Sequence, residues 1–212
     1  MKCVNGGAPV NEYTLTILIN CFCNLNRADL GFSILGSFFK CGYNPSVTTF
    51  TTLLKGLFLE EKVSEGEKLF KKLFREKYCE PNEVTIVTVM DGLCKARETR
   101  KAYRLLWLWE KKGYKPYVGC YNTLINRLCK DGKFDAACKL VSIMIGKGVL
   151  PDVITYSSMI QGLCDFGRWK EAKDLLNEMQ AEKVTPSLRT CNIFLHGLRK
   201  SGQIDEAFPF YP

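Results

Sequence analysis

The sequence lacks the residues that a metal site needs. Its 212 residues include one histidine, His196, and no two cysteines with two residues between them. The nearest pair, Cys21 and Cys23, is spaced too closely for the usual ligand patterns of structural zinc sites. We therefore expect no metal and no other cofactor.

Long apolar segments are also missing. No stretch approaches the roughly 20 apolar residues of a membrane-spanning helix, so we expect no membrane association. The opening residues, MKCVNGGAPV, have neither the apolar run of a secretory signal nor the arginine-rich amphipathic pattern of an organellar presequence. We expect no presequence within this chain.

Cysteine, in contrast, is abundant. There are 11 cysteines, an odd number, and no signal for export to an oxidising compartment. A disulfide framework is therefore not expected. The simpler interpretation is reduced thiols, most of them buried as small apolar side chains.

The charge balance favours an anionic partner. Lysine and arginine total 30 against 22 acidic residues, which gives a formal net charge of +8. Such an excess favours nucleic acid first, and then an acidic protein or membrane surface. Hydrophobic residues make up 46% of the chain, enough for a substantial core.

Several residue types recur with one period. Alanine stands at every thirty-fifth position from Ala102 to Ala207, and cysteine and glycine keep the same period in the middle of the chain. Prolines recur every 35 or 36 residues, at Pro9, Pro45, Pro81, Pro116, Pro151 and Pro186. Independent residue types with one period predict an array of structural repeats.

Each repeat has the pattern of two helices. In one repeat, apolar residues spaced three and four apart predict a first helix with one buried face, formed by Tyr121, Leu124, Ile125, Leu128 and Cys129. Gly132 follows at a position where left-handed backbone often ends a helix. A second apolar stripe runs through Ala137, Leu140, Val141 and Met144. A single helical hairpin cannot bury such faces, so the hairpins must stack into an all-α solenoid.

We place the repeats as follows: a lead segment at 1–10, full repeats at 11–46, 47–82, 83–117, 118–152 and 153–187, and a partial sixth at 188–212. The second helix of the sixth repeat begins near Gln203 and meets Pro209, which should break it. The array then lacks a polar capping helix, and the chain is expected to be less soluble than its length suggests.

The motifs within the repeats resemble those of one family. VTTFTTLLKGL, EVTIVTVMDGLCK, VGCYNTLINRLCKDGKFDAA and VITYSSMIQGLCDFGRWKEA, separated by turns such as GYKPY and GVLPD, closely resemble pentatricopeptide repeats. The signature of tetratricopeptide repeats is absent. The repeats are of the uniform P-class kind, and the first resembles those of plant restorer-of-fertility-like proteins. The resemblance implies a right-handed α-solenoid that binds single-stranded RNA in an organelle, mitochondrion before chloroplast, with no small-molecule substrate.

The resemblance also assigns base-reading residues. In this family each repeat takes one base, through the residue after the aromatic of the first helix (the reader residue) and the last residue of the repeat (the closing residue). The pairs are Thr16 with Ser46, Thr51 with Asn82, Val87 with Tyr117, Asn122 with Asp152, and Ser157 with Ser187, and Asn192 is the reader of the sixth repeat. The family pattern assigns adenine to Thr51/Asn82, uracil to Asn122/Asp152 and a purine preference to Ser157/Ser187. Val87 and Tyr117 suit no base edge.

Two further roles follow from the resemblance. The residue three before the reader inserts between bases, and Val84 and Ile154 have the usual apolar character there. The lysine after the helical cysteine can meet a phosphate, a role for Lys95 and Lys130, with Lys200 at the same place in the sixth repeat.

Other interpretations remain open at this stage. The α-solenoid could be a scaffold for protein partners, or the chain could be a truncated, non-functional copy of a longer repeat protein. Some members of the family carry a catalytic domain, but no His-x-Glu motif is present, because Leu198 follows His196 by two positions. We expect no enzymatic activity.

Overall fold

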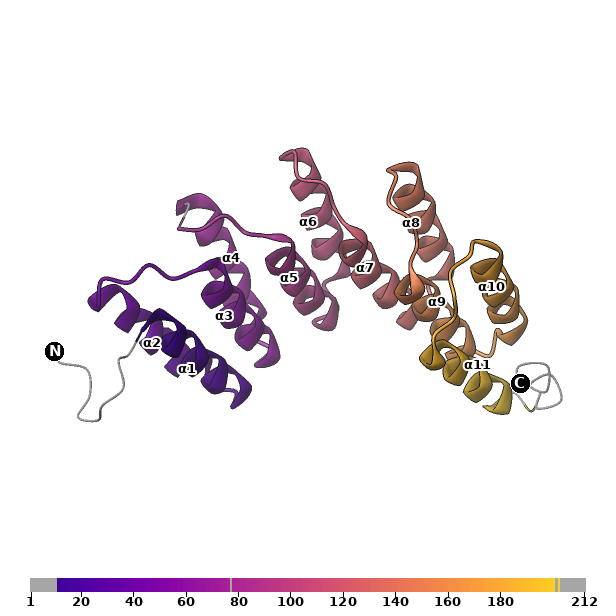
Figure 1. Ribbon diagram of the computed structural model, residues 1–212, viewed down its shortest axis with the longest axis horizontal. Helices are drawn as coiled ribbons and strands as arrows, with labels where there is room; N and C mark the ends of the chain where they lie inside the picture. The colour runs from indigo at the N-terminus through magenta and orange to yellow at the C-terminus, as the bar shows by residue number, and fades with distance from the viewer. Residues whose placement is uncertain (1–10, 77, 201, 203–212) are drawn as a thin grey trace. The chain divides into compact units, whose positions relative to one another are not determined.

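The computed structural model describes residues 11–76, 78–200 and 202, and these ranges form helices without any strand (Figure 1). The helices are α1 (Glu12–Asn24), α2 (Ala28–Lys40), α3 (Val47–Leu59), α4 (Val63–Glu76), α5 (Glu83–Lys95), α6 (Thr99–Lys111), α7 (Val118–Lys130), α8 (Phe134–Gly146), α9 (Val153–Asp165), α10 (Trp169–Ala181) and α11 (Leu188–Lys200). The all-α prediction is confirmed. The predicted second helix of the sixth repeat lies outside the described residues.

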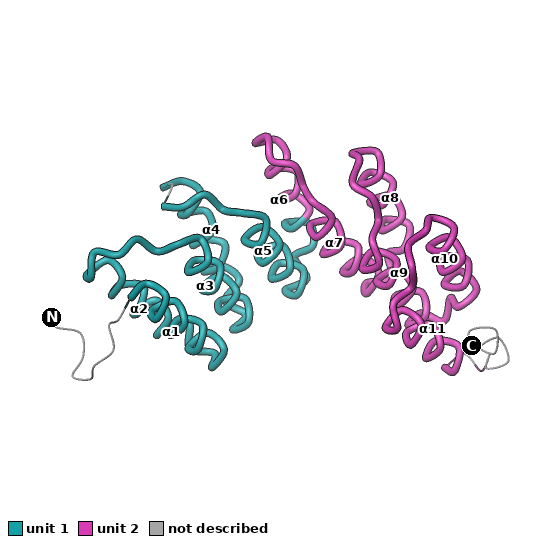
Figure 2. Tube along the Cα trace, in the orientation of Figure 1, with its two compact units in different colours: residues 1–102 teal, residues 103–212 magenta. Residues whose placement is uncertain are grey.

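The helices alternate between two roles. The chain divides into two compact units, residues 1–102 and 103–212 (Figure 2). Within unit 1 the first helices α1, α3 and α5 pack side by side, and α2 and α4 pack against them. Within unit 2, α7, α9 and α11 pack in the same way, with α8 and α10 against them. Each unit is thus a stack of helical hairpins, the arrangement that the sequence period predicts.

The turns inside the hairpins have left-handed backbone. Gly132 has φ +70°, as its place after the first helix predicts, and Gly167 has φ +73°. In unit 1 the same place holds non-glycine residues, Asn26 at φ 56° and Glu61 at φ 58°. Asparagine adopts left-handed backbone readily, whereas a residue such as glutamate loses about 1 kcal/mol there, so Glu61 carries strain that the glycine turns avoid.

The predicted apolar stripes form the core. Tyr121, Leu124, Ile125 and Cys129 are at most 1% exposed, and Ala137 is fully buried. Leu128 and Val141, at the edges of the two stripes, are half-buried. The stripe pattern is therefore confirmed at its centre.

The recurring cysteines fill a contact between neighbouring first helices. Where the helices approach most closely, a small side chain on one faces a glycine on the next. A Cβ placed on Gly162 would lie 2.7 Å from Cβ of Cys129, and one on Gly197 would lie 2.7 Å from Cβ of Cys164. Cys23 faces Gly56 in unit 1 in the same way. These three cysteines are buried, as predicted, and they set the spacing of the helices. The prediction that most cysteines are buried is wrong for the described part of the chain, where five of ten are buried and Cys21, Cys41 and Cys138 are exposed.

These buried thiols should make the protein sensitive to alkali. Burial raises the pKa of Cys129 to about 12 and that of Cys23 to about 11. A thiol in the unfolded chain titrates near 8.5, so above that pH the unfolded state loses protons that the folded state keeps. Stability is therefore fully present below about pH 8.5 and falls as the pH rises, by about 1 to 2 kcal/mol for Cys129 between pH 8 and pH 10.

Urea unfolding at both pH values measures this loss. In Cys129→Ala the difference between the two pH values should be smaller by that amount, although the variant is less stable at both. An unchanged difference would show that Cys129 does not contribute to the pH dependence.

The described helices give no membrane-crossing candidate. The longest, α4, has 14 residues, and none of the helices in these ranges combines the length and apolar character needed to cross a bilayer.

Candidate nucleic-acid interface

The predicted closing residues begin the first helices. Asn82 caps α5 by accepting a hydrogen bond from the backbone N–H of Thr85 at 3.0 Å, and Asp152 caps α9 through the N–H of Thr155 at 2.9 Å. Ser46 and Ser187 accept from the corresponding N–H groups at 3.3 and 3.1 Å. Short polar side chains are preferred at this position because they satisfy helix N–H groups that otherwise have no partner. Each closing residue is therefore held by the helix that follows it.

In four repeats the reader residue lies on the first helix of its own repeat, and its side chain contacts the start of the first helix of the next repeat. In unit 1 the hydroxyls of Thr16 and Thr49 are 3.0 Å apart, and those of Thr51 and Thr85 are 2.8 Å apart. In unit 2 the hydroxyls of Ser157 and Thr190 are 2.8 Å apart. The structure thus brings together the reader, the closing residue and a threonine that sequence reasoning did not single out.

We call Thr49, Thr85, Thr155 and Thr190 the N3 threonines, because each stands three residues after the closing residue that caps its helix. Their hydroxyls are hydrogen-bonded and their side chains are at most 1% exposed. The sequence signal was present, since threonine recurs there with the repeat period. An isolated threonine in a first helical turn is, however, an ordinary capping residue.

The Asn122/Asp152 pair has the most complete network. Nδ2 of Asn122 donates to Oδ1 of Asp152 at 3.0 Å, and the Thr155 hydroxyl donates to Oδ1 of Asn122 at 2.6 Å. The backbone N–H of Thr155 also reaches Oδ1 of Asp152. The predicted pair is therefore in direct contact.

The exposure of the reader residues differs from the expectation. A residue that takes a base is expected to be accessible to it, but Asn122 is only 6% exposed. The cause is the next helix, which covers the amide and supplies both of its partners. Thr16, Thr51, Ser157 and Asp152 are half-buried, whereas Asn192 is exposed. Asn122 can therefore offer a ligand only the edge of its amide.

The predicted stacking residues are exposed. Val84 and Ile154, each in the first turn of its helix, are 60% and 61% exposed. Both are apolar side chains left in water beside the reader positions. Both side chains are therefore accessible to the face of a base.

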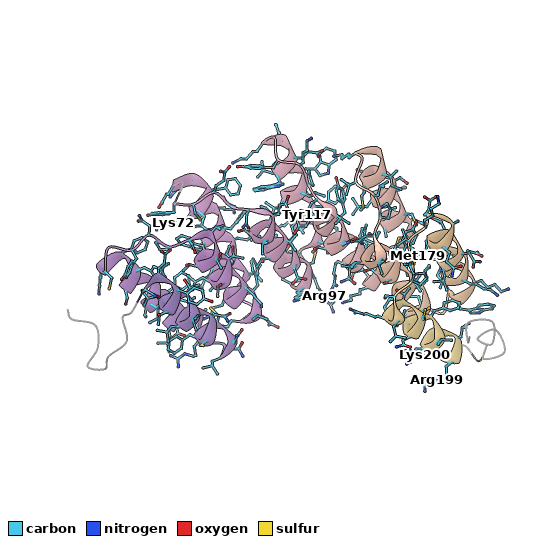
Figure 3. The ribbon with its side chains drawn as sticks, in the orientation of Figure 1. Lys72, Arg97, Tyr117, Met179, Arg199 and Lys200 are labelled. Atoms are coloured by element: carbon cyan, nitrogen blue, oxygen red, sulfur yellow. The ribbon has the colours of Figure 1, made fainter. Side chains whose placement is uncertain are left out.

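The predicted phosphate ligands differ in their surroundings. Lys95 forms an ion pair with Asp91 at 2.8 Å, which reduces its attraction for a phosphate. Lys130 is exposed at the end of α7. Lys200 is exposed and follows Arg199 at the end of α11 (Figure 3). The basic charge is therefore least compensated at Lys130 and Lys200.

The start of α7 departs from this pattern. Its first residue is preceded by Tyr117 (Figure 3), whose side chain makes no capping hydrogen bond. Cys120 stands at the place of the N3 threonine. This helix start therefore lacks the polar group that the other closing residues provide.

Among the described residues, no group of three or more histidine, cysteine, aspartate or glutamate side chains could hold a metal ion.

Comparisons with known proteins identify the repeats. A PPR repeat family model matches residues 45–95, 116–165 and 159–200, and a PPR repeat model matches 13–43 and 84–114. Over 60 residues, the chain is 55% identical to a protein of Arabidopsis thaliana named as a mitochondrial pentatricopeptide repeat-containing protein, which covers 28% of this chain and 10% of that one. Over 69 residues it is 39% identical to mitochondrial Protein Rf1 of Oryza sativa subsp. indica, which covers 32% of this chain and 9% of that one. These matches thus cover about a tenth of the length of each relative.

Solved structures share the fold. Maize PPR10 in complex with an 18-nucleotide psaJ RNA element matches with a TM-score of 0.81 and 24% identity, over 95% of this chain and 29% of that one. The PPR domain of Arabidopsis thaliana protein-only RNase P 1, in complex with tRNA, matches with a TM-score of 0.64 and 16% identity, over 89% of this chain and 98% of that one. Since the family models cover more than half of its residues, the chain belongs to the pentatricopeptide repeat family.

Proposed function

We propose that the chain binds single-stranded RNA selectively, with one base for each helical hairpin, and that it acts by occupying the RNA without catalysis of its own. The observation that carries this proposal is the recurrence of one polar arrangement. Among the described residues, a reader on one helix and a closing residue at the start of the next meet at the same threonine in four places. Hydrogen-bonding groups repeated at the spacing of structural repeats match the way in which helical-repeat proteins take one base per repeat.

The relatives support this proposal. PPR10 was solved in complex with an 18-nucleotide RNA element. The PPR domain of protein-only RNase P 1 was solved in complex with tRNA. The described part of this chain consists of the same kind of helical repeats. Its likeness to the RNase P protein is a likeness to the PPR domain of that protein. The two relatives named as mitochondrial support action on a mitochondrial transcript.

The proposed base contacts follow the family pattern. Thr51/Asn82 would take adenine and Asn122/Asp152 uracil, and the third repeat, with Val87 and Tyr117, would accept any base. Read from the 5′ end, the order is any base or a purine, then A, any base, U, a purine and a pyrimidine. Val84 and Ile154 would contact base faces, and exposed lysines such as Lys130 would contact phosphates.

Fluorescence anisotropy with short labelled RNAs tests the proposal. An RNA with A and U at the second and fourth positions should bind at least several-fold more tightly than one with these two bases exchanged. Affinity should fall roughly tenfold or more between 50 and 200 mM salt, because bound phosphates displace counterions. Equal binding of both RNAs, together with no salt dependence, would reject the proposal.

A protein-binding scaffold is the second candidate, and one feature of unit 1 favours it. Phe39 and Tyr78 are each 50% exposed, with ring centroids 6.4 Å apart. Exposed aromatic residues of this kind are common at protein interfaces. A partner held there would be insensitive to changes at Asn122 and Asp152.

A further inference from the structure

We propose that the N3 threonine is a positioning residue for base selection: it orients the reader residue of the preceding hairpin. This proposal rests on the proposed function, because it concerns how a reader presents itself to RNA. It adds a third side chain, from the following hairpin, to each pair of reader and closing residues.

The first line of evidence is the repetition of the contact. The N3 threonine hydroxyl lies 2.6 to 3.0 Å from a reader oxygen in every one of four cases, at Thr49, Thr85, Thr155 and Thr190. None of these side chains is more than 1% exposed. Each hydroxyl also lies 2.8 to 3.1 Å from an oxygen of the closing residue, so each threonine links its reader to the closing residue that caps its helix.

The second line of evidence is the proton count around Asn122. The Asp152 carboxylate can only accept hydrogen bonds, so the group that faces it must be the NH₂ of Asn122. The carbonyl oxygen of Asn122 then faces Thr155, whose single proton can go to that oxygen at 2.6 Å or to Oδ1 of Asp152 at 3.0 Å, and the shorter distance favours Asn122. Turning the amide over would place its oxygen against the carboxylate and would force the Thr155 proton to move from Asn122 to Asp152. The network therefore fixes the amide in one orientation, with one N–H and one oxygen lone pair left for a base.

The hydroxyl readers are less constrained. Thr51 can donate to the carbonyl of Val47 at 2.7 Å while it accepts from Thr85. Alternatively, Thr85 can donate to Asn82 at 3.0 Å while Thr51 donates to Thr85. In both arrangements the single proton of Thr51 is used within the protein, so Thr51 presents a lone pair, an acceptor, to a base whichever way the protons run. Selection at Asn122 should therefore depend more strongly on its N3 threonine than selection at Thr51 does.

A purely structural role makes a different prediction. If Thr155 served only as part of the capping box of α9, its loss would lower stability and the affinity for all RNAs alike. If it positions Asn122, its loss must change the ratio of affinities for two RNAs that differ at one base. The ratio is thus the measurement that separates the two roles.

The experiment uses the full chain with Thr155→Val, which keeps the shape and removes the hydroxyl. The preference for U over C opposite Asn122 should fall about fivefold, since one hydrogen bond contributes about 1 kcal/mol. Thr155→Ser should retain the preference. Thr123→Val is the matched control, because that hydroxyl bonds only the Gly119 carbonyl of its own helix. The preference for A opposite Thr51 should be unchanged in all three variants.

Should Thr155→Val fail to fold, Thr155→Cys replaces it, since Cys120 occupies the equivalent place in α7. A U-over-C ratio equal to that of the unmodified chain, in whichever variant folds, overturns the proposal. Failure of the proposed function is seen separately, as a lack of base preference in the unmodified chain. The side-chain amide NMR signals of Asn122 without RNA then decide: they should shift in Thr155→Val or Thr155→Cys and not in Thr123→Val, and signals that stay in place overturn the inference.

Discussion

Replacing Asn122 by Thr and Asp152 by Asn together should change the preferred base at the fourth position of the RNA from U to A. The double variant reproduces the pair Thr51/Asn82, which meets its N3 threonine in the same way that Asn122/Asp152 does. We expect the ratio of affinities for A and U at this position to change by roughly tenfold or more, since one or two hydrogen bonds to the base edge are exchanged.

Anisotropy titrations with two RNAs that differ only at this base measure the change. The reciprocal variant, Thr51→Asn with Asn82→Asp, should shift the second position from A to U. Asn126→Thr is the matched control, because it makes the same chemical change one turn further along α7. A double variant that still prefers U would show that these residues do not read the base. If the chain binds no RNA, and a protein partner binds the double variant as tightly as the unmodified chain, the scaffold function is favoured.

The fold was predictable from the sequence because the evidence for it is local and repeated. The stripe from Tyr121 to Cys129 requires only helical periodicity. Gly132 marks a turn because few other residues adopt left-handed backbone without strain. Since stacking buries each hairpin against copies of itself, one repeat determines the environment of the next.

The details of the site were less predictable because they depend on contacts between repeats. Asn122 is buried by α9, which begins 31 residues later, and no pattern around residue 122 indicates this cover. Thr155 resembles any threonine in a first helical turn. Its contact with Asn122 spans 33 positions and becomes visible only when the helices are placed side by side. Sequence reasoning therefore found both members of the pair but not the residue that joins them.

The close contact between first helices should also make Gly162→Ala destabilising. Alanine in a helix normally stabilises by about 1 kcal/mol relative to glycine. Here the new Cβ would lie 2.7 Å from Cβ of Cys129 and 3.2 Å from the Cys129 carbonyl oxygen. These atoms belong to or adjoin the backbone, so α7 and α9 would have to separate. We expect a net loss of about 1 to 3 kcal/mol in the free energy of unfolding, measured by urea denaturation.

Two controls connect this loss to the contact. Gly36→Ala changes a glycine within α2 whose added Cβ would have no neighbour within 4 Å, and it should be neutral or slightly stabilising. In a Cys129→Gly background the effect of Gly162→Ala should shrink, because the atom that it meets is gone, and the coupling between the two changes gives the size of the contact. If Gly162→Ala were as well tolerated as Gly36→Ala, glycine would not be required for the approach of α7 and α9. If Gly162→Ala is destabilising, glycine is required for the short distance between α7 and α9. The same short distance brings Thr155 within hydrogen-bond reach of Asn122. The close packing of these helices and the geometry of the reader residue then have a common origin.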